Sequence, residues 1–189
     1  MLFRSSLPEQ SDTDLSIDEI ARRINEELVA TWGNLVNRVL SMVYSTCGGV
    51  VPAVGGRTAD DLAVLATVDG ALDAVTDLIE RVELRAALRT GMDAAATVNA
   101  YLNATEPWKL ARSDPERAQA VLGTALAAVA GVRVALSPYL PFSTVALDDE
   151  LGPVDAWQRR EPVPGSPIGK PVPLFAKVDV VELLAGDDG

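Results

Sequence analysis

Apolar residues recur with helical spacing over residues 16–47, and this pattern predicts one long amphipathic helix. Ser16 and Glu19 form a capping-box signature at its start, and Gly48-Gly49 supply a stop. At about 100° per residue, one broad arc holds the residues expected in the core: Leu28, Trp32, Leu35, Val36, Val39 and Val43. A polar stripe holds Glu27, Thr31, Asn34, Arg38, Ser41 and Ser45. Asn34 and Arg38 are therefore expected to be neighbours on an exposed helix face.

Further helices follow from the same kind of pattern. Thr58 marks the start of a helix that continues to about Val82, and the next helix covers about residues 84–104. Its expected inward residues are Leu84, Leu88, Met92, Ala95, Val98 and Leu102. Asp114-Pro115 gives the fourth helix a capping residue followed by proline at the first helical position, and a short helix follows Pro141. Because the loops are short, we expect an all-α, antiparallel bundle of four to five helices over residues 16–152.

The two ends of the chain differ in character from this bundle. Residues 1–15 are polar and are interpreted as a linker. Residues 153–189 contain six prolines and several glycines, which predicts an extended tail lying on the bundle or on a neighbouring domain. Within the tail, the apolar run from Val172 to Phe175 is the expected anchor.

Composition excludes several classes of chemistry. The chain has 189 residues, no histidine and a single cysteine, Cys47, so it lacks a His general base, a Ser-His or Cys-His nucleophile and a usual zinc site. No carboxylate pair is singled out by its surroundings, and we therefore assign no catalytic residue, no metal ligand and no cofactor. We find neither a run of some 18 uncharged apolar residues nor a signal sequence, and we expect a cytoplasmic protein without a membrane partner.

The charge balance narrows the possible ligands. A net charge of −11 argues against broad, sequence-independent binding of nucleic acid, because such binding depends on many phosphate contacts. It permits a small local site that reads a few bases. Asn34, Arg38 and the distant pair Pro107-Trp108 offer an amide, a planar donor fork and an aromatic plate, which are the groups that hold unstacked RNA bases. Trp32 and Trp157 are assigned to packing.

Four segments in a fixed order carry a resemblance to a known family. They are Glu26–Ser41, Asn99–Leu102 with Glu106–Ala111, Pro138–Ser143, and Pro173–Phe175 with Lys177. Together they resemble the anticodon-binding domain of methionyl-tRNA synthetases, and the resemblance spans about residues 10–178. It implies a helical bundle of the class I synthetase type that recognises the CAU anticodon of methionine and initiator tRNAs. It also implies that Trp108 stacks on an anticodon base, while Asn34 and Arg38 bond to base edges.

The chain also departs from the complete members of that family. It has neither a HIGH-like nor a KMSKS-like ATP motif, so we expect no charging of tRNA by this chain alone. ATP and Mg²⁺ are expected only in a catalytic domain, which would be a partner of this chain. The stretch from Leu2 to Asp14 resembles the segment that follows the KMSKS loop, which favours a fragment of a longer enzyme. The alternatives are a free-standing paralogue that recruits tRNA, and a helical protein–protein module without RNA binding.

Overall fold

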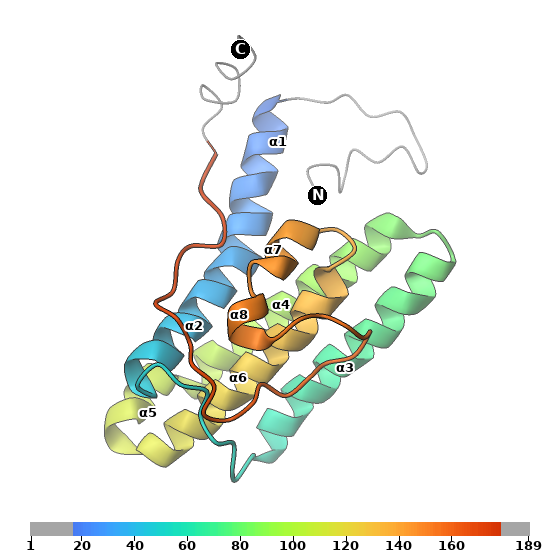
Figure 1. Ribbon diagram of the computed structural model, residues 1–189. Coiled ribbons are helices and arrows are strands. Elements are labelled where there is room, and N and C mark those ends of the chain that lie inside the picture. Colours follow the sequence, from blue (N-terminus) through green and yellow to red (C-terminus); the bar gives the residue numbers. More distant parts are fainter. Residues whose placement is uncertain (1–16, 179–189) are drawn as a thin grey trace.

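The first long helix forms as predicted, but its middle third is wound more loosely than an α-helix. The computed structural model describes residues 17–178, and in it α1 (Ile17–Arg23), the π-helix η1 (Ile24–Gly33) and α2 (Asn34–Thr46) follow one another without a break (Figure 1). The amide of Asn34 donates to the carbonyl of Val29, five residues earlier, which is the π-helical pattern. A wheel drawn at the α-helical angle is therefore wrong over residues 24–33. Leu28, expected in the core, is only half-buried.

Two long helices form a hairpin beside it. α3 (Ala59–Glu80) begins at Thr58, whose amide donates to the carboxylate of Asp61 at 2.9 Å, and α4 (Leu84–Thr105) runs back antiparallel to it. Val82, at φ +60°, makes the turn between them. Leu84 directly follows this turn and is exposed, so its predicted inward position is wrong. The other five residues predicted to face inward on α4 are buried.

α6 (Pro115–Leu136) lies at the centre of the bundle and packs against α2, α3, α4, α5 and α7. Asp114 caps it by accepting the amide of Arg117 at 3.0 Å, as its Asp-Pro start predicts. Neighbours on all sides explain why this helix is apolar around its whole circumference. α6 is the one helix within residues 17–178 that is long and apolar enough to cross a membrane, and 94% of that stretch is buried inside the bundle.

Three short helices complete the fold: α5 (Pro107–Ser113), α7 (Pro141–Val145) and α8 (Asp148–Leu151). α5 was not predicted, and the predicted helix after Pro141 is divided in two at Leu147. Arg133 of α6, only 2% exposed, explains this division. Its guanidinium donates to the carbonyls of Thr144 (2.8 Å) and Gly152 (2.7 Å) and pairs with Asp148, so it holds the ends of α7 and α8 against the core.

The tail after Gly152 lies extended along the bundle, as predicted (Figure 1). Ile168 is buried, and the amide of Val51 donates to the carbonyl of Ser166 at 2.8 Å beside an isolated bridge between Val50 and Pro167. Leu174 and Phe175 pack against the core, which confirms them as anchors. Val172 is 78% exposed and does not take part.

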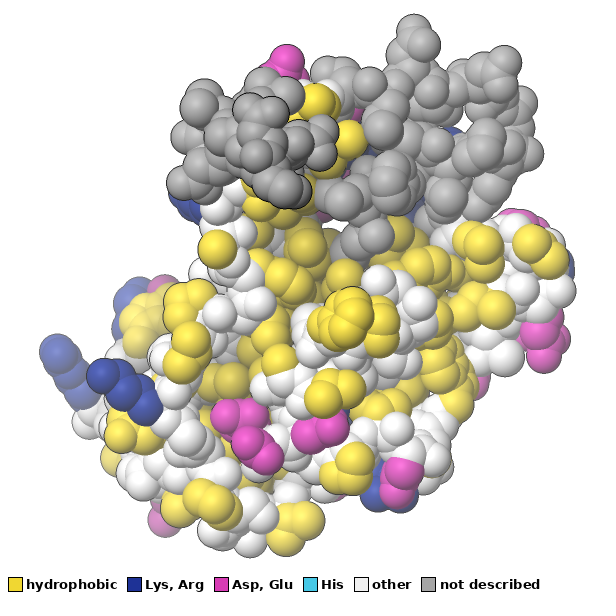
Figure 2. All heavy atoms as spheres, turned by 45° about the horizontal axis from the view of Figure 1, so that its top comes forward, with side chains coloured by type: hydrophobic (Ala, Val, Ile, Leu, Met, Phe, Trp, Pro, Cys, Tyr) yellow, Lys and Arg dark blue, Asp and Glu magenta, His cyan; other side chains and the backbone are white. Residues whose placement is uncertain are grey.

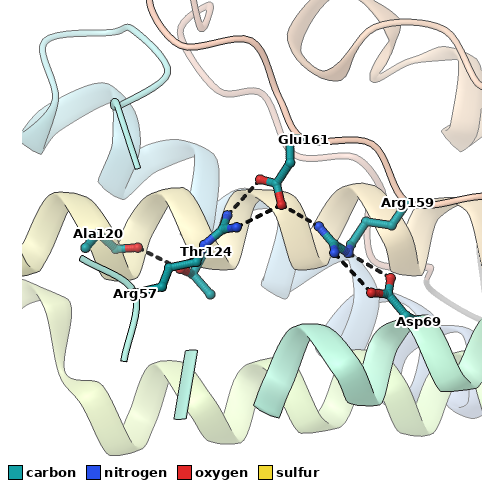
Figure 3. A network of polar contacts seen from close by, with 6 residues as sticks. All are labelled: Arg57, Asp69, Ala120, Thr124, Arg159 and Glu161. Atoms are coloured by element: carbon teal, nitrogen blue, oxygen red, sulfur yellow. Dashed lines mark hydrogen bonds and ion pairs between the residues drawn. The ribbon is translucent and has the colours of Figure 1, made fainter. Parts of the chain in front are cut away.

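Ion pairs fix the middle of the tail. Glu161 pairs with Arg57, which precedes α3, and with Arg159, which in turn pairs with Asp69 of α3 (Figure 3). Arg57 also donates to the hydroxyl of Thr124 on α6 at 3.2 Å, so this network joins the tail to two helices.

The all-α fold class is confirmed, and within residues 17–178 there is no β-sheet. The predicted linker, residues 1–15, the expected cap Ser16 and the last eleven residues of the predicted tail, 179–189, lie outside the described residues. The domain divisions after residues 15 and 152 stay predictions. On the face shown in Figure 2, apolar side chains are spread between charged ones, and Phe142 of α7, at 90%, is the most exposed large hydrophobic residue of the described chain.

Candidate nucleic-acid interface

Arg38 of α2 is held in place by two amide side chains of α4. Its Nη1 donates to Oδ1 of Asn99 at 3.3 Å, and its Nη2 donates to Oδ1 of Asn103 at 3.0 Å. Asn99 and Asn103 lie one helical turn apart, so their oxygens form a row that matches the two ends of the guanidinium. An arginine on a polar helix face is usually mobile in solvent, whereas this one has a fixed orientation.

Asn99 is in turn tied to the first helix. Its Nδ2 donates to the carbonyl of Thr31 at 3.2 Å and approaches the carbonyl of Ala95 at 3.4 Å. Thr31 lies in η1, one turn or more before Arg38 on the same continuous helix. The Asn99 side chain thus accepts from Arg38 and donates to Thr31, so two hydrogen bonds tie it to the first helix at the site.

The backbone between α4 and α5 presents Trp108. Glu106 has a φ of +45°, in the left-handed region, and Pro107 occupies the first position of α5 and is buried. The sharp reversal places the indole of Trp108 at the surface with 42% of the residue exposed. The Cζ atom of Arg38 lies 5.8 Å from the centroid of this ring, a cation–π distance. Arg38 and Trp108, 70 positions apart in the sequence, are thus brought together.

Asn34 completes the predicted set. It is exposed at the first position of α2, one turn before Arg38, and the helix is α-helical from this residue on. Its side chain therefore lies beside that of Arg38 on the same face. The prediction that the two residues share one helix face is therefore correct, but only Asn34 is exposed and Arg38 is half-buried.

Sequence reasoning missed Asn99 and Asn103. Asn99 belonged to a family segment but received no role, and Asn103 received none at all. The signal was their spacing of four residues on a helix that ends at Glu106-Pro107, directly before Trp108. Helical spacing alone would have put both amides on one face. It could not have shown that this face meets Arg38.

A buried polar cluster supports α4 on its other side. Asp61 of α3 is fully buried; it accepts the hydroxyl of Tyr101 at 2.5 Å and both ends of the Arg117 guanidinium, at 2.5 and 2.7 Å. Burial by itself raises the pKa of Asp61, but the hydrogen bonds from Arg117, Tyr101 and the Thr58 amide outweigh it and bring the pKa to about 2. The cluster links α3, α4 and α6, so it determines where α4 carries Asn99 and Asn103.

The site offers hydrogen-bond donors and a stacking surface. It has no acid or base placed beside a nucleophile. Among residues 17–178, no three acidic or cysteine side chains gather where they could hold a metal ion. Burial raises the pKa of the Cys47 thiol, so it is a poor nucleophile at neutral pH.

Comparisons with known proteins agree with this description. Residues 51–179 match the family model described as the anticodon binding domain of methionyl tRNA ligase. Residues 1–40 match the model of the class I tRNA synthetases of the methionine type.

Individual relatives give the same result. The methionine–tRNA ligase of Nocardioides sp. is 38% identical over 203 residues, which cover 91% of this chain and 34% of that protein. That of Chloroflexus aurantiacus is 46% identical over 145 residues, covering 77% of this chain and 24% of that protein. The crystal structure of the free Mycobacterium tuberculosis methionyl-tRNA synthetase superimposes with a TM-score of 0.84 at 27% identity, over 94% of this chain and 39% of that one.

The chain thus spans about a quarter to a third of the length of the curated relatives that it matches. The family model for the anticodon-binding domain covers more than half of it, including α3 to α8 and most of the described tail. The chain therefore belongs to the methionyl-tRNA ligase family, as its anticodon-binding domain.

Proposed function

We propose that this chain recognises the CAU anticodon of methionine and initiator tRNAs through Asn34, Arg38 and Trp108. The observation that carries the proposal is the Arg38 guanidinium, held by two amides of α4 at 5.8 Å from the exposed Trp108 ring. A donor fork of fixed orientation beside an aromatic plate can bond to the edge of a base while the plate stacks on one.

The donors of Arg38 suffice for this task. A guanidinium carries five N–H groups, and the bonds to Asn99 and Asn103 use one N–H each on Nη1 and Nη2. The remaining N–H groups can donate to acceptors on these bases, such as O2 and N3 of cytosine or O2 and O4 of uracil. Asn34 adds an amide, which both donates and accepts. Stacking on an aromatic side chain contributes about 1–3 kcal/mol per base, and a good bidentate pair about the same in discrimination.

We further propose that the chain acts as part of an ATP-dependent methionine–tRNA ligase in the cytoplasm. A catalytic domain would supply the sites for ATP, Mg²⁺ and methionine, and this chain by itself would bind tRNA without charging it. The family match favours this function over the alternatives of a recruiting paralogue and a protein–protein module. It is the function of the relatives named above as methionine–tRNA ligases.

The test is direct binding of anticodon stem-loops, measured by fluorescence anisotropy. The chain should bind a CAU loop more tightly than a loop of scrambled anticodon. Trp108→Ala should weaken CAU binding by about 5- to 150-fold, the equivalent of about 1–3 kcal/mol. Arg38→Lys keeps the charge but removes the planar fork, so it should lower the preference for CAU with little change in salt dependence.

Trp157→Ala is the matched control for Trp108, because Trp157 is 41% exposed on the tail and its indole N–H donates to Leu72 on α3. This variant should leave RNA binding unchanged. Equal affinity for CAU and scrambled loops would show that the base-reading role is wrong. An equal loss in both tryptophan variants would show that the effect of Trp108→Ala is not local.

A further inference from the structure

Most cations of this acidic chain are neutralised by carboxylates. Within residues 17–178, ten arginines and lysines form ion pairs with Asp or Glu: Arg22, Arg23, Arg57, Arg81, Arg89, Lys109, Arg117, Arg133, Arg159 and Arg160. A cation paired in this way presents little positive field to an incoming polyanion. Cations without a carboxylate partner in the described chain, such as Arg38 and Arg112, are therefore the places where RNA phosphates can approach a molecule of net charge −11.

Two of these exceptions flank Trp108. Arg38 bonds to amides and the aromatic ring, with no carboxylate partner in the described chain. Arg112 is exposed on α5, four residues after Trp108, and also lacks a carboxylate partner there. Two acids close in sequence to Arg112 are already engaged, since Glu106 pairs with Lys109 at 2.7 Å and Asp114 caps α6 through the Arg117 amide; Glu116, in the first turn of α6, is the other acid nearby.

Helical geometry places Arg112 next to the stacking surface. Residues four apart on an α-helix have side chains on one face, about 5–6 Å apart at Cβ, and helical side chains lean toward the N-terminus. The side chain of Arg112, near the C-terminal end of α5, is therefore expected to lean back toward Trp108, which lies near the N-terminal end where α5 joins α4. A base stacked on Trp108 would bring its own phosphate, or that of its neighbour, within reach of this guanidinium.

We propose that Arg112 binds a backbone phosphate of the anticodon loop and so positions the nucleotide that stacks on Trp108. This inference rests on the proposed function and adds to it a contact that does not depend on which base is present. Arginine suits the role because its planar fork can bind two phosphate oxygens at once. Acidic residues farther than about 8 Å are largely screened at physiological salt, so the local positive field is what the phosphate meets.

A phosphate contact has a signature that base reading lacks. Each neutralised phosphate on a single strand contributes about −0.7 to the slope of log affinity against log salt concentration. Loss of one contact should therefore reduce the fall in affinity between 50 and 200 mM salt by about 2.6-fold. The loss should be the same for every loop sequence, because every loop carries the phosphate.

The experiment measures the affinity of the whole chain for CAU and scrambled stem-loops across this salt range. Arg112→Ala should weaken both loops by the same factor at low salt and flatten both slopes by about 0.7, with the CAU preference retained. Arg112→Lys should keep most of the slope. Arg89→Ala is the matched control, since Arg89 is an exposed arginine of α4 that pairs with Asp93, and it should change neither quantity. Circular dichroism checks that each variant is folded.

The outcomes separate the two proposals. A CAU preference in the wild type with an unchanged slope in Arg112→Ala overturns the phosphate contact and leaves the proposed function standing. A reduced slope without any CAU preference supports the contact and refutes base reading. A change of CAU preference in Arg112→Ala would make Arg112 a base reader and overturn the inference, and no RNA binding at the lowest salt overturns both proposals.

Discussion

The buried carboxylate of Asp61 makes a quantitative prediction about stability. The pKa of Asp61 is about 2 in the folded chain, against an ordinary value of 3.8. A pKa difference of this size corresponds to about 2.5 kcal/mol. Because the folded pKa is the lower one, this stability is fully present above about pH 5 and is lost as the pH falls toward 2.

Asp61→Asn removes the charge with almost no change of shape. It leaves the Arg117 guanidinium, which water can partly reach, and the buried Tyr101 hydroxyl with weaker acceptors. Breaking a fully buried pair costs about 3–5 kcal/mol, so with the partial exposure of Arg117 we expect about 2–3 kcal/mol at pH 7. In a chain of this length the midpoint of thermal unfolding should fall by about 5–10 °C.

Urea unfolding followed by circular dichroism at pH 7, 5, 4 and 3 tests both parts of this prediction. The free-energy gap between wild type and Asp61→Asn should be constant above about pH 5 and should narrow at lower pH. Tyr101→Phe, which keeps the carboxylate and its partner Arg117, should retain the acid-dependent loss. If the gap stays constant down to pH 3, the carboxylate is not stabilised by its partners as the hydrogen bonds indicate.

Three other predictions concern the tail and the short helices. A Cβ on Gly33 would lie 2.8 Å from Cδ2 of Phe175, so Gly33→Ala should lower the free energy of unfolding in urea by about 1–3 kcal/mol. In the Phe175→Ala background the same change should cost much less, and an equal cost in both backgrounds would refute this contact. Glu161→Gln should lower the free energy of unfolding by less than about 1 kcal/mol and should speed proteolysis of the tail, and this effect should vanish at high salt. The control Asp155→Asn breaks the exposed pair with Arg160 and should not speed proteolysis. Arg133→Lys keeps the charge but loses the guanidinium that donates to three backbone carbonyls, so it should lower the free energy of unfolding by about 2–4 kcal/mol. Arg89→Lys should leave it unchanged, and an equal effect of both variants would exclude a special role for Arg133.

The sequence predicts the long helices well because their ends carry specific signals. Thr58 and Asp114 cap α3 and α6, and the two glycines after Cys47 take φ values of +68° and +72° at the end of α2. The pattern of apolar residues was less reliable at helix borders. Leu84 has helical spacing but lies at the tip of a hairpin, where it is 37% exposed. The spacing of apolar residues shows the period of a helix, but it does not show how far along the helix the neighbouring helices pack against it.

The site was predictable in part. The exposed stripe fixed Asn34 and Arg38 on one face because both lie beyond the end of the π-helix. Their meeting with Trp108 depends on the left-handed turn at Glu106, a conformation that a glutamate rarely adopts and that no local signal announces. The looser winding of residues 24–33 was also hidden, because this segment contains no proline and its apolar residues recur as in an ordinary α-helix.

The two hydrogen bonds between Asn25 and Val178 have a geometric consequence for reading bases. The Asn25 amide donates to the Val178 carbonyl at 2.8 Å and accepts the Val178 amide at 2.9 Å, so both described ends of the chain leave the bundle from one end, away from α5 (Figure 1). Asn25 and Arg38 lie on one continuous helix, about 20 Å apart along its axis. A tilt of the whole bundle by about 10° about the end where Ile17 and Val178 lie would therefore displace Arg38 by about 3.5 Å, close to the rise of about 3.4 Å between neighbouring nucleotides of a stacked strand. Under the proposed function, such a rigid tilt would change which nucleotide the site reaches without altering a contact inside it.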